Sequence, residues 1–107
     1  MLNNVWARVT NTVDTLPTTT VRATLTQTLV SLTTANKELL AAAARDFVML
    51  QNRGSTSAYL SVDGDDATTS DLELLPGESL VFDAVVPQGQ INGIRTSGTA
   101  NIVVISG

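Results

Sequence analysis

The apolar runs of this chain are short, and each one ends at residues that favour turns. Residues 47–50 (Phe-Val-Met-Leu) are apolar, and residues 51–54 (Gln-Asn-Arg-Gly) directly after them are polar turn formers. A run of that length with such an end is typical of a buried strand that enters a tight turn, and not of a helix. The sequence therefore predicts a strand at 47–50 and a turn at 51–54.

The same pattern, a short segment with apolar residues followed by turn-forming residues, continues to the C-terminus. Apolar and polar residues alternate over 58–62 before the cluster Asp63-Gly64-Asp65-Asp66, and Pro76-Gly77 ends an apolar run at 72–75. Gly, Pro and Asp at these places favour turns. Short strands at such intervals predict an all-β chain, built as an antiparallel β-sandwich or jelly-roll-like barrel. Further strands are expected at 79–83, 90–95 and 100–105.

A chain of 107 residues is large enough for one such domain. Residues 1–20 are polar, rich in Thr and interrupted by Pro17, so we expect an extended N-terminal arm followed by a single β-sandwich domain over 21–107. The area of Trp6 is too large to remain in water, and its side chain should pack on its own domain or on a neighbouring chain. The arm residues expected to bind other proteins are Val5, Trp6, Val9, Val13 and Leu16.

The first strand of the domain shows a change of phase. Apolar residues alternate over 21–25, but Val30 and Leu32 continue in the opposite phase. Because a one-residue slip moves side chains to the other face of a sheet, this change predicts a bulge or turn near Gln27-Thr28.

Residues 35–45 allow two interpretations. Their alanines and leucines have high helix propensity, and Asn36 is a good N-cap. The alternative is a strand over 37–41 followed by a turn of small residues at 42–44. Both remain open on the sequence alone.

The chain contains neither histidine nor cysteine. Ser-His and Cys-His pairs, disulfides and most transition-metal sites are therefore excluded. Carboxylate chemistry on sugars needs two converging acids in a cleft lined by aromatic residues, and the aromatic residues are few. We expect no enzymatic activity, no catalytic residues and no cofactor. The aromatic residues are Trp6, Phe47, Tyr59 and Phe82.

The acidic cluster at 63–66, with Asp71 and Glu73 close in sequence, carries the oxygen ligands that a hard cation such as Ca²⁺ prefers. Its spacing departs from that of an EF-hand, because Ala67 stands where a third ligand is needed. The other interpretation is a hairpin turn with surface charge, so no metal site is assigned. The glycines form no phosphate-binding motif and are expected in turns.

Charge is distributed unevenly. The formal net charge is −4, and beyond Arg53 the single base, Arg95, stands against seven acidic residues. This half would repel phosphate backbones, so nucleic-acid binding is not expected. The first residues lack the pattern of a secretory signal and no apolar run approaches the length of a membrane span, so we expect a protein made in a cytoplasm and not bound to a membrane.

The last expected strand is apolar on both faces. Val103 and Ile105 alternate with Ile102 and Val104. Either this strand lies centrally in the sandwich, or another subunit covers one of its faces.

An ordered series of short motifs fills residues 45–107. The motifs are Arg45-x-Phe47-Val48-Met49-Leu50-Gln51-Asn52-x-Gly54, Ala58-Tyr59-Leu60, Ala67-Thr68-Thr69, Leu74-x-Pro76-Gly77-Glu78-Ser79-Leu80, Val86-Pro87-x-Gly89-x-Ile91 and Ser97-Gly98-Thr99-Ala100-x-Ile102-x-Val104-Ile105-x-Gly107. In this order the motifs resemble small virion proteins of tailed bacteriophages, over just over half of the chain. Residues 1–44 are not covered.

The resemblance implies a structural protein of a phage particle, a head decoration (cement) protein or a head-fibre module. Such proteins are β-rich, often trimeric, and bind the outer capsid where shell subunits meet. The expected partners are therefore the major capsid protein and copies of this chain, in a homotrimer on the outer surface of the virion. Two other functions remain open: a head–tail or tail component, and a carbohydrate- or receptor-binding module that uses Tyr59 and the acidic cluster.

Overall fold

The computed structural model describes residues 24–107, so the expected arm at 1–20 and its five candidate interaction residues lie outside the described residues. Within the described range the chain forms eight strands and no helix. The strands are β1 Thr26–Ser31, β2 Lys37–Leu40, β3 Val48–Asn52, β4 Ala58–Ser61, β5 Leu72–Leu74, β6 Ser79–Phe82, β7 Ile91–Ile94 and β8 Asn101–Ser106.

From β1 to β8 the chain is one long antiparallel hairpin, rolled into two layers. Strand β4 pairs with β5, β3 with β6, β2 with β7 and β1 with β8. The outermost pair, Thr26 with Ser106, and the innermost pair, Leu60 with Leu72, are both centred in sequence on Asp66. The acidic cluster is therefore the tip of the hairpin, which explains why turn-forming residues gather there.

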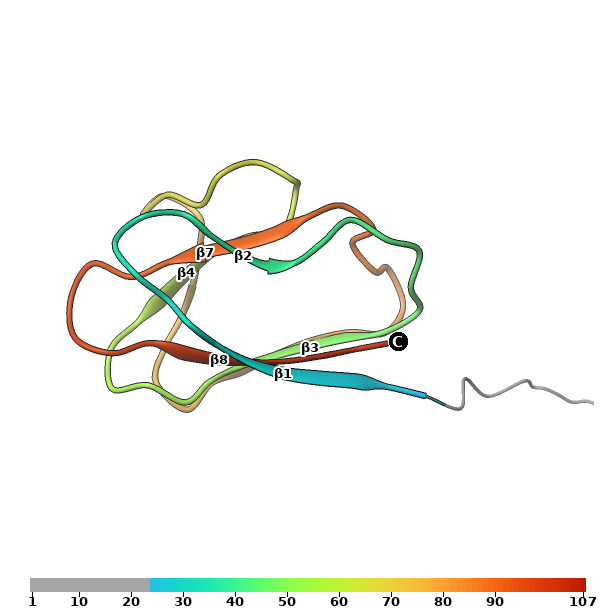
Figure 1. Ribbon diagram of the computed structural model, residues 1–107, viewed down its shortest axis with the longest axis horizontal. Helices are drawn as coiled ribbons and strands as arrows, with labels where there is room; N and C mark the ends of the chain where they lie inside the picture. The colour runs from blue at the N-terminus through green and yellow to red at the C-terminus, as the bar shows by residue number, and fades with distance from the viewer. Residues whose placement is uncertain (1–23) are drawn as a thin grey trace, which may run out of the picture.

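Rolling places the strands in two four-stranded sheets, with the orders β1-β8-β3-β6 and β2-β7-β4-β5. Figure 1 shows the two layers, with β1, β3 and β8 below and β2, β4 and β7 above. Eight antiparallel strands that alternate between two sheets in this way form a jelly roll. The predicted all-β sandwich of the domain is confirmed.

The core fills the space between the two sheets. It consists of the alternate residues of each strand that point inward, as the period of two in a strand requires. The largest fully buried apolar side chains come from both sheets and include Leu50, Leu60, Ile91 and Ile102. Strand β8 lies between β1 and β3, a central position in its sheet, as the first of the two interpretations of the last strand expects.

Residues 37–40 form β2, so the helical interpretation of residues 35–45 is wrong. The strand pairs with β7, and Leu39 is buried in the core. Helix propensity is a weak preference of a few tenths of a kcal/mol per residue, and strand pairing with burial of a leucine outweighs it.

The predicted bulge near Gln27-Thr28 is also wrong. Strand β1 pairs with β8 in unbroken register from Thr26 to Ser31. The apolar pattern changes phase in the sequence because this strand carries apolar residues on both faces: Val30 packs against the core, whereas Leu29 points outward and is 62% exposed. The register shift occurs instead in β2, between Glu38 and Leu40.

Part of the turn expected at 51–54 belongs to β3, which continues through Gln51 and Asn52. Asn52 is fully buried, and a buried amide must have its hydrogen bonds satisfied. Its Nδ2 donates to the carbonyl oxygens of Thr56 and Leu74 at 2.8 and 2.9 Å, and its Oδ1 accepts from the backbone N–H of Gly54 at 2.8 Å. Asn52 therefore ends β3 through hydrogen bonds inside the fold, and not as a turn residue on the surface.

Candidate interaction face

Charge divides the two sheets. No residue in β1, β8, β3 or β6 is charged, whereas the other sheet carries Lys37, Glu38 and Glu73 within its strands. Uncharged strands are expected where both faces of a sheet are covered. One face of this sheet lies on the core. The other face points away from the core and yet carries no charged residue within its strands.

The outward residues of the uncharged sheet form an apolar band across all four strands. Gln27, Ile105, Met49 and Val81 are cross-strand neighbours in one row, from β1 to β6. In the next row Leu29 pairs with Val103, which pairs with Gln51. We define the apolar band as Leu29, Met49, Val81, Val103 and Ile105.

The band is most exposed at its two ends. Leu29 is 62% exposed in β1 and Val81 is 48% exposed in β6, whereas the central Val103 is 8% exposed. No described segment of the chain crosses this face, as Figure 1 shows below the lower sheet. An uncovered apolar patch of this kind, surrounded by polar residues, is typical of a surface that binds protein.

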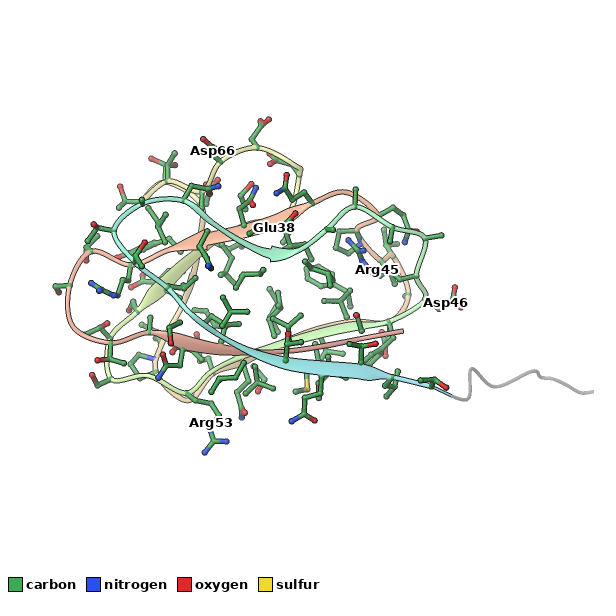
Figure 2. All side chains as sticks on the ribbon, viewed as in Figure 1. Glu38, Arg45, Asp46, Arg53 and Asp66 are labelled. Carbon is green, nitrogen blue, oxygen red and sulfur yellow. The ribbon has the colours of Figure 1, made fainter. Side chains whose placement is uncertain are left out.

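A hollow of about 270 Å³ lies at the border of the band, lined by Leu29, Arg53 and Asn101. Arg53 follows β3 and its side chain extends away from the lower sheet in Figure 2. Asn101 accepts a hydrogen bond from Ser31 Oγ at 2.9 Å. The hollow combines an apolar side chain with a cation, which suits a partner that presents a carboxylate beside apolar surface.

The outer face of the other sheet has the opposite character. The loop after β4 folds back over it: Asn92 Nδ2 donates to the carbonyl oxygen of Asp65 at 2.8 Å, and Asn36 Oδ1 accepts from the N–H of Ala67 at 2.7 Å. Figure 2 shows Glu38 and Asp66 on this side of the molecule, away from Arg53. This face is acidic and partly covered by its own chain.

The acidic loop is held by hydrogen bonds within the protein. Asp63 Oδ1 accepts from Ser61 Oγ at 2.7 Å and from the N–H of Asp65 at 3.1 Å. These bonds, the one from Ser61 first, hold the pKa of Asp63 below its ordinary value, although burial of the group acts the other way. The buried Oδ1 of Asn92, an oxygen that could bind a cation, accepts no hydrogen bond. A cation site also needs several acidic side chains around one point, and no three of them in the described range meet this requirement.

Replacing Ser61 with alanine is expected to raise the pKa of Asp63 toward that of an ordinary aspartate, which an NMR titration of the carboxyl carbon measures. A lowered pKa in the folded state stabilises the fold above the unfolded pKa of about 3.9, and this contribution is lost as the pH falls through the folded pKa. The stability difference between the wild type and Ser61→Ala should therefore shrink in acid. An unchanged Asp63 pKa in the variant would show that the hydrogen bond does not lower it.

The structure places Tyr59 in the same sheet that the acidic loop folds over. Tyr59 lies on β4, opposite Glu73 and Ile94, in the sheet that does not carry the apolar band. The arm residues lie outside the described range. The band itself was not predicted, although Leu29 and the two-faced apolar pattern of the last strand were its signals.

In residues 24–107 no helix has the length and hydropathy needed to cross a membrane.

No protein-family model matches the sequence, and no curated protein matches it. Among solved structures the chain is similar to the solution NMR structure of a de novo designed double-stranded β-helix, with 22% sequence identity and a TM-score of 0.49. The match covers 76% of this chain and 96% of the designed one. The description as a jelly roll rests on the strand order and register of this chain itself.

Proposed function

We propose that this chain is a structural protein of a phage virion, a decoration protein that binds the outer surface of the head and stabilises the shell. It acts through contacts between proteins and carries out no reaction. Its partners are the major capsid protein and further copies of the chain, with a trimer favoured by the resemblance to small virion proteins.

The observation that carries this proposal is the contrast between the two outer faces of the sandwich. One face is acidic, polar and partly covered by the hairpin tip. The other is uncharged and carries the apolar band. A protein that binds a shell needs one surface for protein contacts and another that keeps the particle soluble, and this division supplies both.

The arm at 1–20 is the segment we propose to meet the shell, with Trp6 as its main anchor. An extended segment that adds to the sheet edge of a neighbour gains main-chain hydrogen bonds along its length. When several copies bind one shell, modest contacts of this kind give a high total affinity, because the later contacts are intramolecular.

Removing residues 1–20 is expected to leave a folded domain that no longer binds heads, because the deleted segment carries the shell contacts while the jelly roll begins after it. The measurement is co-sedimentation of the deleted and the full chain with bare, expanded heads of the same phage. Circular dichroism of the deleted chain controls for folding. Full binding by a folded, deleted chain would remove the arm from the proposal.

Trp6→Ala in the full chain is the companion variant. It keeps the length of the arm and removes only its largest apolar side chain, so it separates loss of the anchor from loss of the segment. Thr10→Ala is its matched control, because it truncates a small polar residue of the same arm.

A further inference from the structure

The apolar band belongs to a chain whose charged residues are mostly acidic. The described range holds nine acidic residues and four basic ones, and all of them lie outside the four strands of the uncharged sheet. If two copies met through the acidic loop and the outer face beneath it, like charges would come together, which costs free energy. The outer face of the uncharged sheet is where identical copies can meet without that repulsion.

The border of the band adds an attraction for an acidic partner. Arg53 is exposed and lines the hollow beside Leu29. A second copy that meets this face brings its own Glu78, which is exposed and directly precedes β6, and this carboxylate is the group that Arg53 attracts.

The place where the N-terminal segment joins the fold also favours a second copy. Residues 1–23 join it next to β1, the edge strand that carries Leu29. Leu25 is 55% exposed and, two residues before Gln27, shares its phase, so apolar surface continues to the point where the segment begins. The apolar surface that a second copy can cover therefore extends from the apolar band to Leu25.

We propose that the apolar band is the surface through which copies of this chain associate, so that its occupant is a second copy of the same protein. Leu29 and Val81, the exposed ends of the band, lose their contact with water, and Met49, Val103 and Ile105 pack between them. This inference rests on the proposed function, which includes further copies of the chain among the partners. Association through this face does not require a shell, so it can hold even if binding to the shell fails.

The test compares Val81→Glu with Val85→Glu in the full chain. Both variants add one negative charge in place of an exposed valine, but Val81 lies in the band and Val85 lies in the loop after β6, 87% exposed. Sedimentation equilibrium of the wild type should show an assembled species. Val81→Glu should raise the dissociation constant by about tenfold or more, because it buries a charge in the interface, while Val85→Glu should leave it unchanged.

A labelling experiment keeps the proposal testable if Val81→Glu unfolds. The chain has no cysteine, so Val81→Cys and Val85→Cys each introduce a single thiol. The rate of maleimide labelling at position 81 should fall as the protein concentration rises, while the rate at 85 stays constant. A wild type that remains monomeric up to about 1 mM, or equal behaviour of the two positions in either experiment, would overturn the proposal.

Discussion

Replacing Arg45 with methionine is expected to lower the free energy of unfolding by about 3 kcal/mol. The side chain is 6% exposed and lies between the loop after β2 and the loop after β6. Its guanidinium donates to the carbonyl oxygens of four residues. Methionine fills a similar volume without any donor, so four carbonyl oxygens lose a charged partner. The accepting residues are Ala41, Ala43, Pro87 and Gly89.

Gln88, in the loop after β6, makes two hydrogen bonds to the backbone of Arg45. Its Oε1 accepts from the backbone N–H of Arg45 at 2.9 Å, and its Nε2 donates to the carbonyl oxygen of Arg45 at 2.8 Å. Burial lowers the pKa of Arg45, but arginine still keeps its charge at any ordinary pH. The bonds from this cation to backbone oxygens are therefore charge-assisted, which makes their loss costly.

Urea unfolding measures the effect at a protein concentration low enough that copies do not associate, because association would otherwise change the apparent stability. Arg45→Lys should fall between the wild type and Arg45→Met, since an ammonium lacks the planar fork that reaches several carbonyls at once. Arg53→Met is the matched control: Arg53 is exposed, so the change should stay within about 0.5 kcal/mol. Equal losses at positions 45 and 53 would contradict this account of the loops.

Gly54→Ala is expected to cost about 3 kcal/mol or more, or to force a local rearrangement. A Cβ atom at Gly54 would overlap the carbonyl oxygen of Thr99 and would lie 2.5 Å from the Cα of Ala100. Both neighbours are backbone atoms, so no side chain can rotate away. The close approach arises because the N–H groups of Ser55 and Thr56 both donate to Thr99, at 2.8 and 3.0 Å.

Gly89→Ala provides the comparison. The nearest atom to a Cβ at Gly89 is the Cα of Gly64 at 4.0 Å, which is an ordinary contact. Its stability should change by no more than about 0.5 kcal/mol, and the reduced freedom of the unfolded chain acts in favour of the variant. Thermal and urea unfolding of both variants measure the difference. If Gly54→Ala were as stable as Gly89→Ala, the close contact with Thr99 would be wrong.

The positions of the turn-forming residues predicted most of the strands, because such residues end a strand through their own backbone conformation. Pro76-Gly77 ends β5 where expected, and Gly77 has a φ of 84°, a conformation that favours glycine. The helical alternative at 35–45 failed for the opposite reason. The pairing of β2 with β7 is fixed by residues more than fifty positions away, which no local propensity records.

The interaction face escaped prediction because apolar residues are ordinarily assigned to the core. The change of phase at Val30 and Leu32 predicts a shifted register, yet Leu29 points outward in an unbroken ladder. Only the pairing of β1 with β8 and of β8 with β3 shows that Leu29, Val103 and Met49 share one surface. Once strand order is known, an apolar pattern on both faces of a strand becomes a signal for such a surface.

Several residues that carry the resemblance to virion proteins serve the fold. Arg45 joins two loops, Asn52 ends β3 from inside, and Gly54 admits the backbone of Thr99. Motifs of this kind describe how the jelly roll is built, and a fold can serve many functions. The proposed function therefore depends on surfaces, above all the apolar band and the arm, and on experiments that address them.

Imaging of heads is the most direct test of the central claim, that this chain stabilises a phage shell by binding its outer surface. Bare, expanded heads of the same phage would be mixed with the full chain and examined by electron cryomicroscopy. We expect ordered added density of jelly-roll size on the outside of the shell, where shell subunits meet. Heads that remain bare at a saturating concentration of folded protein, or density confined to the neck or tail, would contradict the claim.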